Sequence, residues 1–572
     1  MNIAQYMVSL FHHAGVQRIW GITGDSLNGL ADSLRADGHI EWIGVRHEEV
    51  AAFAAGAEAE ISGKLAVCAG SCGPGNLHLI NGLYNCYRNS VPVLAIAADI
   101  PSSESGTRYF QETDPGQLFA GCSIFCEKIT TAQQMPQVLE TAMRQAILKR
   151  SVSVLILPGD IALTPLPTKI PIKWQAPQPP LTTPDGQLIK LAADILNNCE
   201  KVTLMCGAGC QNAHDEVIAL ARTLNAPIVH ALRGKEFIEY DNPYDVGMTG
   251  LIGFASGYQA MENADVLLLL GTSFPYRHFY PKHSQVIQVD RAPEAIGRHV
   301  QVDLGIVSDV LAALSVLQPL LIPKASSQFL QKCQQHYQAS RKKLDAEAKN
   351  RHASSPIHPQ TLACAINQKA SDTAIFICDV GTPTLWAARY LKTNGHRRLI
   401  GSFNHGSMAN ALAQALGAQM VDRQRQVIAF CGDGGFSMLM GDLLTLKPYN
   451  LPVKIVILNN SSLGFVDLEM KAAGFVSKAT NLDNPCFSAI ASACGMQSCR
   501  VSLPNELSPA IDDWLHATGP SVLEVVTDRH ELSFPPKMAP EYAKGFGLYS
   551  LKAVINGYGD ELLELAKVNL FR

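Results

Sequence analysis

Short, continuous apolar runs recur along the chain, and a stretch of helical character follows each of them. Strands that are apolar throughout, rather than at every second position, are typical of parallel α/β sheets covered on both faces. The number of runs exceeds what one ordinary doubly wound sheet holds, so the pattern predicts several stacked α/β domains. The runs are Leu65–Cys68, Val91–Ala98, Val152–Leu157, Val202–Cys206, Val266–Leu270, Val286–Val289, Ala374–Cys378, Val427–Cys431 and Val453–Leu458.

Changes in composition divide the chain. Residues 164–184 are rich in proline, which favours a linker over a helix or an inner strand. Residues 324–356 are polar and charged, with a predicted helix at Phe329–Ala348, and strand-like runs cease after Asp528. We therefore expect three domains at residues 1–180, 181–334 and 335–530, followed by a short helical tail at 531–572.

Composition and charge narrow the class of protein. The 572 residues are 47% hydrophobic, and 46 Lys and Arg against 50 Asp and Glu leave a net charge of -4. Without a basic surface, nucleic acid is not an expected partner. The 15 cysteines form no CxxC pair, which favours reduced thiols over disulfides or a zinc site. No run reaches the roughly 18 apolar residues that span a bilayer, and the first Lys or Arg is Arg18, so we expect a cytosolic protein without a signal peptide.

Two predicted strands end in oxygen-bearing side chains. Val427–Gly432 is followed by Asp433, and Val453–Leu458 leads to Asn460, 27 positions later. The carboxyl ends of neighbouring parallel strands share one crevice, and carboxylate and amide oxygens suit Mg²⁺, which completes its shell with phosphate and water. Gly434 and Gly435 let a phosphate approach the backbone near a helix start. A Gly-Asp-Gly-Gly segment alone is often only a tight turn; the pair at this spacing predicts a metal and diphosphate site.

This pair resembles the metal motif of the thiamine-diphosphate enzymes. The resemblance implies Mg²⁺ binding by Asp433, Asn460 and the backbone carbonyl of Ser462. Asn404–Asn410 is similar to the segment of that family that holds the aminopyrimidine, with Met408 as an apolar wedge, although a methionine there is also a common core residue. The residues implied to contact thiamine diphosphate here are Gly406, Ser407, Met408, Asp433, Gly434, Gly435, Asn460, Ser461, Ser462, Leu463, Gly464, Phe465 and Val466.

Glu48 and Glu49 begin an Ala-rich predicted helix. Acids in a first helical turn are favoured by the helix dipole alone. The resemblance adds a second interpretation, in which Glu48 is the activating carboxyl group that shares a proton with the pyrimidine ring nitrogen of thiamine. The glycine-rich turn Gly70–Asn76 matches a cofactor-facing loop of the family, and Phe110 and Gln111 match residues near the reacting centre. Because Glu48 and Asp433 fall in different domains, the resemblance also implies a site shared between subunits of a homo-oligomer, usually a tetramer.

The middle region lacks a complete dinucleotide fingerprint, because Asn212 occupies the third glycine position after Gly207 and Gly209. It contains instead several strand-end features that resemble the FAD domain of thiamine-dependent oxidases, although each could be an ordinary α/β turn. The resemblance thus implies three doubly wound domains that bind pyrimidine, FAD and diphosphate in that order. The residues implied to contact FAD are Thr249, Gly250, Leu251, Ile252, Thr272, Ser273, Phe274, Pro275, Tyr276 and Asp290.

Nearly the whole chain is similar to the quinone-reducing pyruvate oxidases of this family, notably at residues 19–30, 66–83, 228–236 and 401–410. This implies decarboxylation of pyruvate to acetate and CO₂, with electrons passing through FAD to ubiquinone. Phe465 would assist that transfer, unless it is simply a core residue. Two alternatives remain: a carboligase of the acetolactate synthase type that retains FAD, and a non-catalytic FAD-binding scaffold.

The end of the chain offers a route to a membrane-bound quinone. Asp560–Arg572 begins with acids and continues with leucines and Phe571 among charged residues. An interfacial helix and a helix docked on its own domain have similar spacing. The resemblance favours a lipid-binding tail on the cytoplasmic face of the cell membrane, hidden at rest and released when substrate reduces the flavin.

Overall fold

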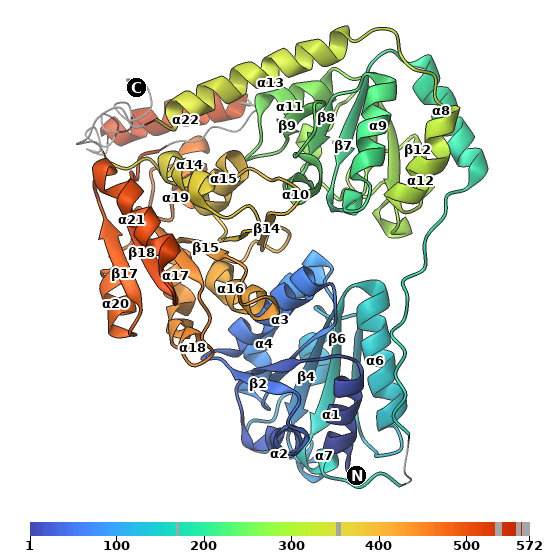
Figure 1. Ribbon diagram of the computed structural model, residues 1–572, viewed down its shortest axis with the longest axis vertical. Coiled ribbons are helices and arrows are strands. Elements are labelled where there is room, and N and C mark those ends of the chain that lie inside the picture. Colours follow the sequence, from blue (N-terminus) through green and yellow to red (C-terminus); the bar gives the residue numbers. More distant parts are fainter. Residues whose placement is uncertain (168–170, 350–355, 532–539, 556–561, 563–564, 566–572) are drawn as a thin grey trace.

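The computed structural model describes residues 1–167, 171–349, 356–531 and 540–555, together with Leu562 and Leu565. It contains three six-stranded sheets, and every strand pair in them is parallel. Helices lie on both faces of each sheet (Figure 1). The predicted fold class, three doubly wound α/β domains, is therefore confirmed.

The first sheet has the strand order β2-β1-β3-β4-β6-β5. Its inner strands are buried and mainly apolar, whereas the edge strands β2 and β5 are partly exposed. The strands are β1 (Arg18–Gly21), β2 (Glu41–Gly44), β3 (Ala66–Gly70), β4 (Val93–Asp99), β5 (Phe125–Lys128) and β6 (Val152–Pro158). The helices are α1 (Ile3–His13), α2 (Asn28–Asp37), α3 (Glu48–Ser62), α4 (Pro74–Asn89), α5 (Pro115–Phe119), α6 (Met135–Lys149) and α7 (Gly159–Ala162).

The second sheet has a different order, β12-β11-β10-β7-β8-β9. Its strands are β7 (Val202–Cys206), β8 (Ile228–His230), β9 (Asp245–Met248), β10 (Val266–Leu270), β11 (Gln285–Asp290) and β12 (Leu304–Val307). Its helices are α8 (Gly186–Asn198), α9 (His214–Leu224), α10 (Lys235–Ile238), α11 (Ala255–Glu262), α12 (Val310–Leu317) and α13 (Gln328–Glu347). Helix α13 packs on α11 and β9 and runs across residue 334, where we expected a boundary. The three predicted boundaries stay predictions.

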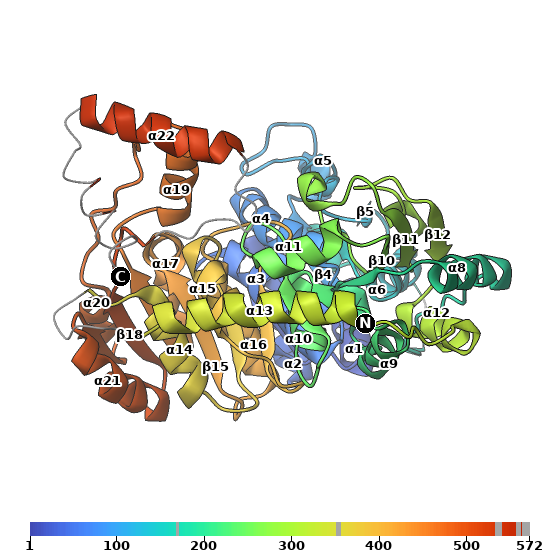
Figure 2. The ribbon, with the colours of Figure 1, turned by 90° about the horizontal axis from the view of Figure 1, so that it is seen from above.

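The third sheet has the order β14-β13-β15-β16-β18-β17. Its strands are β13 (Ile375–Cys378), β14 (Arg398–Gly401), β15 (Val427–Gly432), β16 (Lys454–Asn459), β17 (Gln497–Val501) and β18 (Ser521–Val526). Its helices are α14 (Pro359–Lys369), α15 (Thr382–Tyr390), α16 (Asn410–Val421), α17 (Asp433–Leu439), α18 (Leu443–Leu446), α19 (Gly464–Ala472), α20 (Phe487–Ala493) and α21 (Pro504–His516). Helix α22 (Pro540–Ile555) packs on α19 (Figure 2).

The first and third domains share one hydrophobic core, in which α3 crosses α16. The crossing requires Gly417, because a Cβ there would lie 1.9 Å from the backbone oxygen of Ala54. The chain between the first two domains is extended, with neither helix nor strand at residues 171–185, as expected for a linker. Within the described parts of the chain, no helix is both long and apolar enough to span a bilayer.

Candidate active site

The predicted metal ligands lie at the carboxyl edge of the third sheet, where β15 and β16 are neighbours. Asp433 follows β15, and its Oδ2 accepts hydrogen bonds from the Ser461 amide (2.7 Å) and from Asn484 Nδ2 (2.8 Å). Asn460 Oδ1 accepts a bond from the Ser462 amide at 3.0 Å. The structure therefore brings the Asp433 carboxylate against the turn that carries Asn460 and Ser462. Burial raises the pKa of Asp433 above its usual range.

Small residues surround this turn. A Cβ on Gly434 would lie 2.9 Å from the Leu463 side chain and 3.3 Å from Met408 Cε. Met408 and Leu463, both predicted from the sequence, thus meet over Gly434. Any side chain at this position would fill the space between them.

The sequence interpretation missed a second carboxyl group at the same edge. Asp379 follows β13 and is buried, and a Cβ on Gly435 would lie 1.9 Å from its Oδ2. Its Oδ1 accepts a bond from the Asn410 amide, whereas Oδ2 has no hydrogen-bond partner in the described part of the chain. Burial raises its pKa to about 7. The signal was available, because Asp379 ends an apolar run just as Asp433 does.

Asn484 was also missed, and here the sequence carries no signal. It lies in a loop 51 positions from Asp433, and its Nδ2 bonds both Asp433 Oδ2 and Asn459 Oδ1. Asn459, the first residue of the Asn-Asn pair, donates its Nδ2 to Glu524 Oε1 on β18 and accepts a hydrogen bond from the Ser461 amide at its Oδ1. The two asparagines therefore have different partners.

Glu48 begins α3, with His47 as the N-cap residue. The side chain is 8% exposed, and its Oε2 lies 2.9 Å from Nδ1 of His78 on α4. A Cβ on Gly75, in the predicted cofactor-facing loop, would lie 3.1 Å from Glu48 Oε1. Glu48 thus contacts that loop within the first domain.

Glu49 points elsewhere. Its Oε1 accepts a hydrogen bond from Asn81 Nδ2 at 2.7 Å. Asn81 also bonds Ser407 Oγ (2.8 Å) and His405 Nε2 (2.8 Å), both in the segment 404–410 of the third domain. Glu49 therefore supports a contact between domains, while Glu48 faces the loop.

The segment around Phe110 follows β4 at the same edge of the first sheet. Gln111 Oε1 lies 3.3 Å from Cys72 Sγ, which places Gln111 against the glycine-rich loop. Arg108 and Gln111 both have positive φ (62° and 61°), and Phe110 between them is 78% exposed. Gln111 and Glu48 thus both lie beside the loop Gly70–Asn76, whereas Phe110 projects away from the protein.

The residues expected to contact FAD converge at the carboxyl edge of the second sheet. Thr249 follows β9 and is buried, and its Oγ1 has no partner among the described residues. Gly250 has a φ of 102°, and a Cβ there would lie 3.0 Å from the Phe274 ring, which joins the loops after β9 and β10. Asp290 ends β11, and burial raises its pKa. Thr272 is buried and Tyr276 partly exposed beside them.

One arginine connects this edge to the third domain. Arg389 on α15 is buried, and it donates hydrogen bonds to the carbonyl oxygens of Ile252 (3.0 Å) and Gly253 (3.2 Å). Burial lowers its pKa to about 10. Helix α15 begins at Thr382, after Gly381 with a φ of 109°, so the helix that holds the middle loop starts beside the Asp379 strand end.

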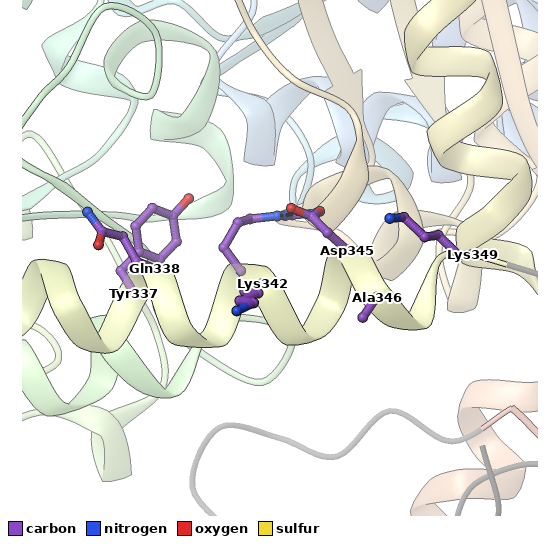
Figure 3. A pocket seen from close by; sticks show the side chains of 7 residues that line it. Tyr337, Gln338, Lys342, Asp345, Ala346 and Lys349 are labelled. Carbon is purple, nitrogen blue, oxygen red and sulfur yellow. Dashed lines mark hydrogen bonds and ion pairs between the residues drawn. The ribbon is translucent and has the colours of Figure 1, made fainter.

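Two hollows accompany these residues. One is an open hollow along the outside of α13, and Figure 3 shows that its side chains come from that helix and from Lys349 just after it. It lies away from the strand ends. The other is lined by Thr382, Asn460 and Gly464, and also by Leu565 near the end of the chain. Of the two hollows, only the second is lined by predicted cofactor-binding residues, Asn460 and Gly464.

Comparison with known proteins assigns each domain. The profile described as "Thiamine pyrophosphate enzyme, N-terminal TPP binding domain" matches residues 1–118, the central-domain profile matches 189–317, and the C-terminal TPP binding domain profile matches 379–525. A putative thiamine pyrophosphate-containing protein of Bacillus subtilis, YdaP, is 36% identical over 98% of both chains. The chain belongs to the thiamine pyrophosphate enzymes.

Named relatives of this thiamine pyrophosphate enzyme differ in activity. The pyruvate oxidase of Lactiplantibacillus plantarum is 30% identical over 86% of this chain and 83% of its own length. The large subunit of acetolactate synthase isozyme 2 from Escherichia coli is 29% identical over 94% of this chain and 97% of its own. Similarity alone does not separate an oxidase from a carboligase.

The residues present fit the cofactors of a thiamine pyrophosphate enzyme. At the third-sheet edge, a buried carboxylate, two amide side chains and a glycine-lined space match Mg²⁺ and a diphosphate. At the second-sheet edge, the buried Thr249 Oγ1, which has no partner among the described residues, and Gly250 with its positive φ match a group that needs hydrogen bonds and close approach to the backbone.

Proposed function

We propose that this enzyme decarboxylates pyruvate oxidatively to acetate and CO₂, and that its electrons pass through FAD to ubiquinone at the membrane surface. When bound, thiamine diphosphate supplies the carbon nucleophile and electron sink for decarboxylation, and FAD accepts the released electron pair. The protein's part is to bind and orient these groups, to move protons and to keep water out.

The third-domain turn is proposed to hold the metal and the diphosphate. Asp433 Oδ, Asn460 Oδ1 and the Ser462 carbonyl are the proposed Mg²⁺ ligands. Gly434, Gly435 and the turn Ser461–Val466 would face the diphosphate, and segment 406–408 would hold the pyrimidine. A cation next to Asp433 would offset the cost of burying its charge.

Glu48 is proposed to exchange a proton with the pyrimidine ring nitrogen. The structure supports this role because Oε2 is held by His78 while Oε1 faces Gly75, so the carboxylate has one fixed and one open oxygen. Since Glu48 contacts its own domain and not the Asp433 turn, a second copy of the chain would complete the site. A homotetramer, with Phe110 and Gln111 near the reacting centre, is part of the proposal.

The observation that carries the oxidase proposal is the position of α22. This helix packs on α19, which begins at Gly464 in the proposed diphosphate turn. Tyr549 and Ala553 are buried against the protein, whereas Leu551 and Val554 are 60% and 63% exposed. An apolar helix face one element away from the thiamine turn suits an enzyme that delivers electrons to a lipid-soluble acceptor, and a carboligase has no need of it.

The tail is proposed to bind lipid on the cytoplasmic face of the cell membrane. The segment Asp560–Arg572 lies outside the described residues except for Leu562 and Leu565. Leu565 lines the hollow beside Asn460, which supports a tail that rests on the proposed site and leaves it when the flavin is reduced. Deleting residues 550–572 should abolish flotation with liposomes and leave pyruvate-dependent reduction of a soluble dye. Flotation of the truncated enzyme would contradict the lipid role.

Product analysis separates the two activities. Purified enzyme with Mg²⁺ and thiamine diphosphate is given pyruvate and liposomes that contain ubiquinone. The oxidase proposal predicts one acetate per quinone reduced. Acetolactate in place of acetate, with the quinone still oxidised, would establish the carboligase, which the similarity to acetolactate synthases favours. If neither acetate nor acetolactate forms, the result would favour the scaffold interpretation.

A further inference from the structure

A cluster of metal-ligating side chains lies outside the proposed active site, at the opposite edge of the first sheet. It consists of His12 near the end of α1, Asp37 at the end of α2 and His39 in the turn that follows. Helices α1 and α2 lead into the amino-terminal ends of β1 and β2, whereas Glu48 and the glycine-rich loop follow strand carboxyl ends. Figure 1 shows α1 and α2 close together near the N-terminus. The cluster is therefore separate from the residues proposed to act on thiamine diphosphate.

The spacing of the three side chains suits a metal ion better than direct hydrogen bonds. His12 Nδ1 lies 3.6 Å from Asp37 Oδ1, and His39 Nδ1 lies 3.6 Å from Asp37 Oδ2. Both distances are too long for good hydrogen bonds. A tetrahedral ion with ligands at about 2.1 Å separates its ligand atoms by about 3.4 Å, close to the observed spacing. One ligand atom from each residue falls within 4.8 Å of the others.

Two further features favour a cation here. Helices α1 and α2, of 11 and 10 residues, both end at the cluster, and the carboxyl ends of helices carry partial negative charge. The imidazoles of His12 and His39 are also stacked, with centroids 4.2 Å apart and 24° between the planes. Ring stacking limits the side-chain entropy that binding would cost.

We propose that His12, Asp37 and His39 form a binding site for a divalent transition-metal ion of the zinc class. Imidazole nitrogens with one carboxylate suit Zn²⁺, Co²⁺ or Ni²⁺ better than Mg²⁺ or Ca²⁺, which prefer oxygen ligands. His39 Nδ1 now lies 2.8 Å from the Asp37 carbonyl oxygen. Coordination through this atom exchanges that hydrogen bond for a metal bond and leaves the ring proton on Nε2. The ion joins the ends of α1 and α2, and water completes its shell.

Cobalt(II) is the probe that tests this site. Holoenzyme saturated with Mg²⁺ and thiamine diphosphate is titrated with Co²⁺ at about pH 7.5, above the ordinary pKa of histidine, where the rings can bind metal. The readouts are the visible d–d bands, which are strong only for tetrahedral ions, and the metal content after dialysis. The site predicts one additional Co²⁺ per chain with a tetrahedral spectrum and no thiolate charge-transfer band.

Matched variants locate the ion. Asp37→Asn and His39→Gln should each abolish the tetrahedral spectrum and the extra equivalent. His13→Gln is the control, because His13 adjoins His12 but bonds the Ser9 carbonyl with its Nδ1, and this variant should bind as wild type does. Wild-type enzyme that takes up no extra Co²⁺, or binding that survives both Asp37→Asn and His39→Gln, would overturn the proposal. Loss of binding in His13→Gln would also overturn it.

Discussion

The first and third domains have the same sheet topology and different chemistry. Numbered within each domain, both sheets have the order 2-1-3-4-6-5. At the carboxyl edge, the third domain places Asp433 and Asn460 on a glycine-lined turn, whereas the first places Glu48 beside His78. The topology therefore fixes where a ligand can bind, and the loop residues decide which group binds there. The middle sheet has a different strand order, and among the described residues its carboxyl edge carries neither a metal-binding turn of this kind nor a hydrogen-bonded glutamate–histidine pair.

The largest expected effect comes from the first domain. Glu48→Gln keeps the shape of the side chain and removes its ability to exchange a proton, so we expect turnover to fall by about 10²–10⁴-fold. Pyruvate-dependent dye reduction measures it, with circular dichroism to confirm folding. Glu49→Gln is the matched control. Glu49 accepts a hydrogen bond from Asn81, which in turn contacts the third domain. Equal losses of turnover in both variants would contradict the assignment of proton exchange to Glu48 alone.

The corresponding change in the third domain acts through the metal. Asp433→Asn leaves one oxygen to accept hydrogen bonds from the backbone but removes the negative charge. We therefore expect Mg²⁺ affinity to fall by about 10- to 100-fold. Titration of thiamine-dependent activity with Mg²⁺ measures the shift, and excess Mg²⁺ should restore part of the activity. An unchanged Mg²⁺ requirement would remove Asp433 from the metal site.

The link between the third and middle domains should have a smaller effect. Arg389→Met removes the hydrogen bonds to the Ile252 and Gly253 carbonyls, worth about 1.5–3 kcal/mol for a charged donor, while keeping much of the side-chain volume. We expect FAD to dissociate about tenfold more readily, with the Mg²⁺ requirement unchanged. Flavin fluorescence after dilution measures the loss. Retention of FAD as in wild type would show that the middle loop is held without Arg389.

The smallest effect concerns pH and Asp379. Burial raises its folded-state pKa from 3.8 to about 7, so the folded protein binds this proton more tightly than the unfolded chain. Its contribution to stability is full at acidic pH and is lost as pH rises from about 4 to about 7. Asp379→Asn should therefore raise the melting temperature of the cofactor-free enzyme more at pH 7.5 than at pH 5. An equal change at both pH values would contradict the raised pKa.

Sequence patterns located most of the buried inner strands and left out the sheet edges, and they also missed the inner strands β1 and β18, which Arg18 and Glu524 interrupt. Central strands such as β4, β10 and β15 are long apolar runs, because both faces are covered. Strands β5 and β17 lie at sheet edges with polar, partly exposed residues, and β8 has only three residues, so none of them forms such a run. Local composition reports burial on both faces, which edge strands lack.

The same limit applies to the site. Asp433 and Asn460 were predictable because strand ends in neighbouring βα units share a crevice. The pairing of Glu48 with His78, 30 positions apart, depends on how α3 packs on α4, and the Asn484 contact depends on a loop. The contact of Arg389 with the middle loop depends on the docking of two domains. Such contacts follow from tertiary packing and leave no periodic signal.

Anaerobic reduction of the bound flavin tests the central claim most directly. Pyruvate is added without oxygen to enzyme reconstituted with FAD, and the flavin absorbance is followed with and without thiamine diphosphate and Mg²⁺. The account predicts complete bleaching only when both are present, and release of one CO₂ per flavin. Bleaching without thiamine diphosphate, or a flavin that stays oxidised with all components present, would contradict it.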